Sequence, residues 1–118
     1  MNAGRFDEYN SLNITAGATV TLISIPVPGN LRAIVTAFAN YVGQTAALGS
    51  ITWRVLVNGI ARSPLEDVAD VLGDQAQPWP VEDDRLVANG GSILAVEATN
   101  SGGVTYSVGA RIVGRYER

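Results

Sequence analysis

A period-two alternation of hydrophobic and polar residues recurs along this chain, whereas the spacing of an amphipathic helix does not. Residues 18–25 (ATVTLISI) are rich in β-branched residues and precede the turn sequence PVPG, so they predict a strand. Residues 51–57 (ITWRVLV) alternate in the same way. The dipeptide Asn58-Gly59 follows them, and this pair is a strong hairpin signal that predicts a return strand over 60–62.

One segment is apolar on both faces. Residues 31–42 (LRAIVTAFANYV) carry hydrophobic side chains at odd and at even positions. Such a strand is typical of one that is buried on both sides. We expect one side to face the core and the other to contact a second subunit, with Ile34 and Phe38 as candidate contact residues.

The C-terminal third shows short runs separated by turn sequences. Residues 85–88, 92–99 and 104–116 read as strands, and the last alternates most cleanly. The turns between them are 89–91 (NGG) and 100–103 (NSGG). These three strands are expected to form a β-meander.

Residues 63–84 are the least regular segment. Ser63 as an N-cap and Pro64 at the first helical position favour a short helix over 64–72. The tripeptide Pro78-Trp79-Pro80 argues against regular strand pairing, because proline cannot donate to a β-ladder.

About seven or eight short strands, joined by Gly, Pro and Asn turns without βαβ alternation, predict an all-β antiparallel sandwich. A jelly roll is the first choice, and an immunoglobulin-like or other sandwich is the second. Residues 1–12 lack the alternation and read as an extended N-terminal arm, expected to be mobile until a partner orders it. Residues 13–118 then form a single β-sandwich domain, which the length of 118 residues fits.

Composition excludes several functions. The chain has no histidine and no cysteine, and all eight cations are arginine against eleven acids, for a net charge of −3. The cysteine nucleophile and the histidine general base that catalysis often uses are therefore absent. The sequence also lacks the clustered positive charge that binding to a nucleic acid requires. No stretch approaches the ~20 apolar residues of a membrane span. The N-terminus has no apolar region of the kind a signal peptide needs.

Only 16% of the residues are charged and 47% are hydrophobic. This ratio is low for a protein whose whole surface faces water, so part of the surface is expected to be covered by a partner.

The acidic residues are candidates for a metal or catalytic site. They gather in the irregular segment, at Glu66, Asp67, Asp70, Asp74, Glu82, Asp83 and Asp84. Their spacing is not that of an EF-hand loop, although an ad hoc cation site or a glycosidase-like carboxylate pair stays open. A solvated loop, or a rim that meets arginines of a neighbour, is favoured. We therefore expect no catalytic residue, metal or cofactor.

The two tryptophans have different contexts. Trp53 lies on the inward face of an alternating strand, which favours core packing over sugar binding. Trp79 stands between prolines and is more open. It is expected to be an interface anchor or a lid over one end of the sandwich, with a sugar platform as the alternative.

The strings IPVPGNLRAIVTAFANYVG, ITWRVLVNGIA, GGSILAVEATN and YSVGARIVGRYER occur in this order over residues 25–118. Together they resemble the small β-sandwich decoration, or cement, proteins of tailed-bacteriophage capsids. That family implies a jelly-roll-like subunit, often trimeric, seated on the capsid lattice. A head-fibre base or a tail-associated virion protein would fit the same strand pattern.

The resemblance and the composition lead to one functional hypothesis. The chain is expected to be a non-enzymatic virion structural protein that assembles in the host cytoplasm and sits on the outer capsid surface. It would trimerise and bridge subunits of the major capsid protein. Arg5, Phe6 and Tyr9 are the candidate capsid contacts, and Trp79 joins Ile34 and Phe38 as a candidate subunit contact. The alternative is a carbohydrate-binding or receptor-binding module of a virion.

Overall fold

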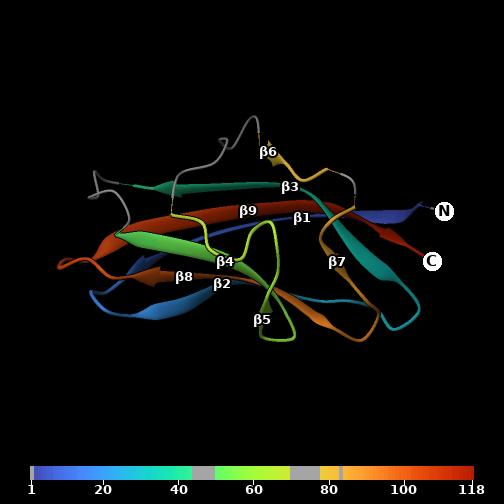
Figure 1. Cartoon of the computed structure of the whole chain (residues 1–118), viewed down its shortest axis with the longest axis horizontal. Coiled ribbons are helices and arrows are strands. Elements are labelled where there is room, and N and C mark those ends of the chain that lie inside the picture. Colours follow the sequence, from blue (N-terminus) through green and yellow to red (C-terminus); the bar gives the residue numbers. More distant parts are fainter. Residues whose placement is uncertain (1, 44–49, 70–77, 83) are drawn as a thin grey trace.

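The computed structural model describes residues 2–43, 50–69, 78–82 and 84–118 (Figure 1). These residues form strands and connecting loops and include no helix that could cross a bilayer. The strands are β1 (Asn2–Ile14), β2 (Thr19–Pro26), β3 (Arg32–Val42), β4 (Ile51–Val57), β5 (Ile60–Ala61), β6 (Trp79–Pro80), β7 (Val87–Ala88), β8 (Ile93–Asn100) and β9 (Tyr106–Glu117).

The strands make two antiparallel sheets. The five-stranded sheet has the order β1-β9-β3-β6, with β7 also paired to β3, and the four-stranded sheet has the order β2-β8-β4-β5. Figure 1 shows β1, β3 and β9 running together above β2, β4 and β8, with both termini at one end. The predicted all-β antiparallel sandwich is therefore confirmed.

Alternation along the strands builds the core. Alternate residues of β4 and β8 are buried, among them Trp53, Val55, Leu94 and Val96, and they meet the inner face of β9. The indole Nε1 of Trp53 donates a hydrogen bond to the Gly109 carbonyl oxygen at 3.2 Å. The largest core side chain thus buries its ring without leaving its one donor unpaired.

The N-terminal segment is a strand and not a free arm. β1 pairs with β9 in continuous register from Arg5 opposite Arg115 to Ile14 opposite Tyr106. Its backbone is extended, as expected, but it is fastened to the sheet along this length. The alternation was hidden because β1 lies at the sheet edge, where its inner face is only partly covered and tolerates polar Glu8 and Asn10.

The expected C-terminal meander is wrong. β7 pairs with β3, β8 pairs with β2 and β4, and β9 pairs with β1 and β3. The turns around Gly90 and Gly102 therefore carry the chain from one sheet to the other. An added Cβ at Gly90 would overlap the backbone of Gly29 and Leu31, so glycine is needed where the 89–91 turn meets the loop between β2 and β3.

The irregular segment also differs from expectation. Residues 64–69 form no helix, and residues 70–72 lie outside the described part of the chain. Val68 instead makes an antiparallel bridge to Trp53 at the edge of the four-stranded sheet. Trp79 and Pro80 do pair with β3, as the two-residue strand β6, which a proline permits because β6 is itself an edge strand.

Strand β3 is buried on both faces, as predicted, but its own chain covers it. Ile34 and Phe38 have no exposed surface in the single chain, so neither can be a direct subunit contact and both assignments are wrong. A β-bulge between Val35 and Ala37 also reverses the alternation. Phe38 consequently joins the core beside Val35, whereas Ile34 lies outside that core cluster.

Candidate functional site

The outward side chains of β1, β9 and β3 form a polar network. Asp7 of β1 accepts two hydrogen bonds from Arg111 of β9, at 2.9 Å from Nε and 2.7 Å from Nη2. The bond from Arg111 is the main reason that the pKa of the Asp7 carboxyl lies below its usual value. This bidentate ion pair links the edge strand β1 to its neighbour β9.

A tyrosine pair spans all three strands. The hydroxyls of Tyr9 on β1 and Tyr41 on β3 lie 2.6 Å apart, and their rings stack at 6.2 Å. The Tyr41 ring fills the space that a Cβ would take at Gly109, on the β9 strand between them. The hydrogen bond with Tyr41 raises the pKa of Tyr9, whereas a hydrogen bond with Ser11 is the first cause of the lowered pKa of Tyr41.

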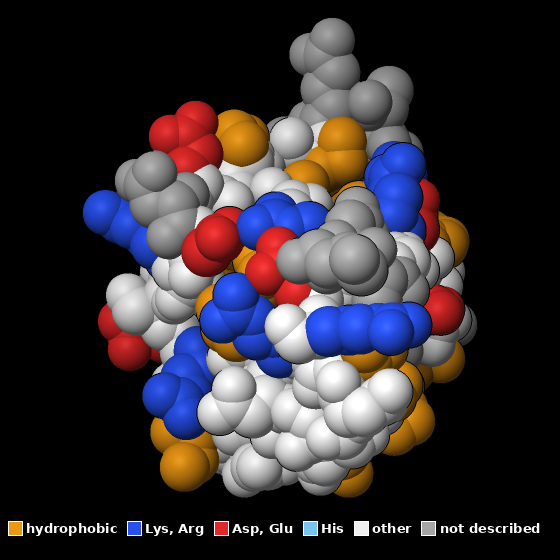
Figure 2. Space-filling view, turned by 90° about the vertical axis from the view of Figure 1, so that its right-hand side faces the viewer, with side chains coloured by type: hydrophobic (Ala, Val, Ile, Leu, Met, Phe, Trp, Pro, Cys, Tyr) orange, Lys and Arg blue, Asp and Glu red, His pale blue; other side chains and the backbone are white. Residues whose placement is uncertain are grey.

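A second ion network lies nearer the chain termini. Arg115 donates to Asp84 at 2.9 Å and to Glu117 at 2.8 Å, and Glu117 also accepts from Arg32 at 2.9 Å. Its bond from Arg115 is the first cause of the lowered pKa of Glu117. Figure 2 shows arginines and acids gathered on the end of the sandwich where the termini lie.

These networks account for part of the acidic segment. Asp84 has a positive φ of 49° and pairs with Arg115 of its own chain. The expected pairing of this segment with arginines of a neighbour stays a prediction. Asp70, Asp74 and Asp83 lie outside the described residues. Within the described part of the chain, no group of three or more His, Cys, Asp or Glu residues is placed to hold a metal ion.

The three candidate capsid contacts lie on β1 and point in two directions. Tyr9 is 47% exposed and Arg5 is also exposed, so both side chains can reach a partner. Phe6 is buried and packs over Gly114, with its ring centroid 5.2 Å from that of Tyr116. Phe6 therefore belongs to the fold and is not a surface anchor.

The open edge of β1 was missed in the sequence. β1 is the outermost strand of its sheet, and among the described strands only β9 pairs with it. β2 is the outermost strand of the other sheet on the same flank, and Asn10 Nδ2 donates to the Leu22 carbonyl oxygen across it at 2.8 Å. Leu12 adds a hydrophobic side chain there that is 40% exposed.

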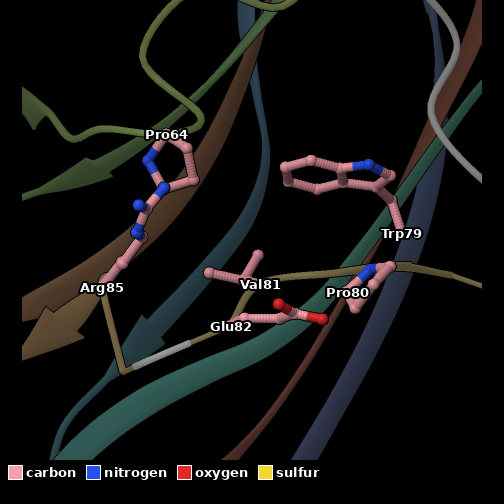
Figure 3. A pocket seen from close by; sticks show the side chains of 6 residues that line it. All are labelled: Pro64, Trp79, Pro80, Val81, Glu82 and Arg85. Atoms are coloured by element: carbon pink, nitrogen blue, oxygen red, sulfur yellow. The ribbon is translucent and has the colours of Figure 1, made fainter.

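Trp79 borders a pocket at the opposite flank. The pocket encloses about 340 Å³ and is lined by Pro64, Trp79, Pro80, Val81, Glu82 and Arg85. Trp79 is 36% exposed, so it remains available to a partner, as expected. Figure 3 shows the indole extending from β6 on one side and Arg85 on the other.

Comparison with known proteins assigns this chain to no family. Neither a scan against protein-family models nor a search of curated proteins finds a match to this chain.

Proposed function

We propose that the sandwich is a jelly roll. Successive strands alternate between the sheets: β1 and β3 belong to the five-stranded sheet, and β2 and β4 to the other. The same exchange recurs near the C-terminus, where β8 and β9 belong to opposite sheets. Two interleaved Greek keys produce this kind of wrapping.

This chain is, in our proposal, a virion structural protein that decorates the capsid and has no enzymatic role. It binds the major capsid protein on the outer surface of the shell, and it acts as a homotrimer. Attachment stabilises the shell by mass action, because each bound subunit adds contacts that only the assembled lattice offers. The family resemblance of residues 25–118 is the basis for naming the capsid as partner.

The open edge of β1 is the observation that carries this proposal. β1 is 13 residues long, and its outer edge is free of any described strand. A long exposed edge offers backbone groups for pairing with another chain, and stable proteins usually cover it. Arg5, Asp7 and Glu8 place charges along it, so a partner segment must match them.

Point variants on this edge test the attachment. We expect Leu12→Ser and Arg5→Ser to weaken binding to capsids that lack the protein by about tenfold or more, a loss of about 1.4 kcal/mol. Ile93→Ser is the matched control, because Ile93 is exposed on β8, which pairs with β2 and β4 and not with β1. Co-sedimentation with the capsids measures the binding. Equal weakening by all three variants would contradict a role for the β1 edge.

One observation favours the alternative, a carbohydrate-binding or receptor-binding module of a virion. The partly exposed Trp79 stands beside a carboxylate and a guanidinium in a pocket, which is the combination of groups that such a function needs. Copy number separates the two candidates, because a receptor-binding module is a minor component of the particle.

A further inference from the structure

The pocket beside Trp79 combines apolar walls with two charged groups that pair with none of the described residues. Trp79, Pro80 and Val81 come from β6 and the residue after it, and Pro64 faces them from the segment that follows β5. Val81 is buried, and its N–H donates to the Thr36 carbonyl oxygen at 2.8 Å. The wall that carries the indole is therefore fixed to the bulge of β3.

Glu82 and Arg85 supply the polar groups. Both side chains are exposed, and neither forms an ion pair or hydrogen bond with another described residue. In this respect they differ from the nearby Asp84 and from Glu117, which are both bonded to Arg115. A carboxylate that accepts and a guanidinium that donates are thus left available to a ligand.

These features match the chemistry of a pyranose ring. One face of such a ring is made of C–H groups that pack on an indole, and its rim carries neighbouring hydroxyls. A carboxylate accepts from two adjacent hydroxyls, and a guanidinium donates to two oxygens. One negative and one positive charge balance in the pocket, which favours an uncharged sugar over an acidic one.

We propose that this pocket binds a neutral hexopyranose unit of a glycan, with Trp79 as the stacking platform and Glu82 and Arg85 as the hydroxyl-binding groups. The volume of about 340 Å³ is sufficient for one sugar ring and its substituents. The site lies on β6, at the other side of the five-stranded sheet from β1. A subunit attached through β1 would therefore keep the pocket open.

The two tryptophans give this proposal a direct assay. Trp53 is buried and hydrogen-bonded to Gly109, so its fluorescence should not respond to a sugar at the surface. Trp79 is partly exposed and reports on the pocket. We expect glucose-, galactose- or mannose-terminated oligosaccharides, screened on an array with acidic glycans included, to bind and to shift the emission of Trp79.

Variants assign the binding to named residues. Trp79→Ala should weaken glycan binding about tenfold or more, and Glu82→Gln and Arg85→Gln should each weaken it measurably. Ile60→Ala, at an exposed apolar residue of β5, should leave it unchanged. Thermal unfolding of each variant separates loss of the site from loss of the fold.

The proposal would be overturned if no neutral glycan binds, if only acidic glycans bind, or if binding survives in folded Trp79→Ala protein. Binding of a proline-rich peptide in place of sugars would also overturn it. None of these results bears on capsid attachment, which is measured separately with the β1 variants.

Discussion

Asn100 shows how one side chain joins three segments of this fold. It is fully buried at the end of β8, and its Nδ2 donates to the carbonyl oxygens of Ile14 at 2.9 Å and Val104 at 2.8 Å. Its Oδ1 accepts from the Gly102 N–H at 2.9 Å. The end of β1, the end of β8 and the turn into β9 are thus held together by a single amide.

We expect Asn100→Ala to lower the free energy of unfolding by about 1–3 kcal/mol, because it leaves buried backbone groups without partners. Urea unfolding followed by fluorescence measures the change. Asn89→Ala is the control, since Asn89 is exposed in a turn and only its backbone accepts a bond in that turn. Equal effects of the two substitutions would show that the amide network does not hold these segments.

At the scale of the element, the contacts of β1 decide whether the N-terminal residues are a free arm or part of the sandwich. Its inner face places Phe6 over Gly114 and Ile14 in the core, and its outer face holds Asp7 and Tyr9 in contact with β9 and β3. The strand is therefore integral to the sandwich, and its outer edge, not a detached arm, is the feature available to a partner.

Phe6→Ala tests the placement of β1. Removing a buried phenyl ring should destabilise the protein by about 3 kcal/mol, the lower end for phenylalanine because the strand is at an edge. Arg5→Ala, which removes an exposed neighbour, should change stability by less than about 0.5 kcal/mol. Thermal and urea unfolding measure both variants. If Phe6→Ala is as stable as the wild type, residues 1–12 are a free arm after all.

The same elements show what a sequence pattern can and cannot reveal. β4 and β9 were predicted nearly to their ends, because the sequence of each alternates between larger apolar residues and small or polar ones over most of its length. β1 was missed because its inner face at the open flank carries Glu8 and Asn10. The faces of β3 were misassigned after Thr36, since a bulge changes the alternation without a sequence signal of its own.

The pairing of strands that are distant in the sequence was harder to predict than the strands themselves. A turn such as 89–91 has the same residues whether it closes a hairpin or crosses between sheets, so the pairing of β7, β8 and β9 could not be read from it. The candidate site shows the same limit. Trp79 was singled out by its proline neighbours, but Pro64 and Arg85 reach its pocket only through the fold.

For the molecule as a whole, surface ion pairs predict a response to acid. Arg111 lowers the pKa of Asp7, and Arg115 lowers the pKa of Glu117, so these carboxylates stabilise the folded state at pH values above their unfolded pKa of about 4. That stability is lost as the pH falls through the lowered folded pKa.

We expect the melting temperature to change little near pH 6–7, since no histidine is present, and to fall below about pH 4. Asp7→Asn should reduce the acid-dependent part of the free energy of unfolding by less than about 1 kcal/mol, because the Asp7 side chain is substantially exposed and solvent screens its ion pair. Calorimetry of both proteins from pH 2 to pH 7 measures this, at pH steps of about 1. A larger melting shift around pH 6.5 than below pH 4 would contradict the assignment to these carboxylates.

The composition of purified virions tests the central claim, that this sandwich is a structural decoration of a capsid. Quantitative mass spectrometry of virions from cells that express the chain should find it at a fixed ratio to the major capsid protein, in numbers comparable with that protein. Sedimentation of the isolated protein should give three times the 12.4 kDa chain mass. Absence of the chain from purified virions would contradict the account, and a few copies per particle would favour the receptor-binding alternative.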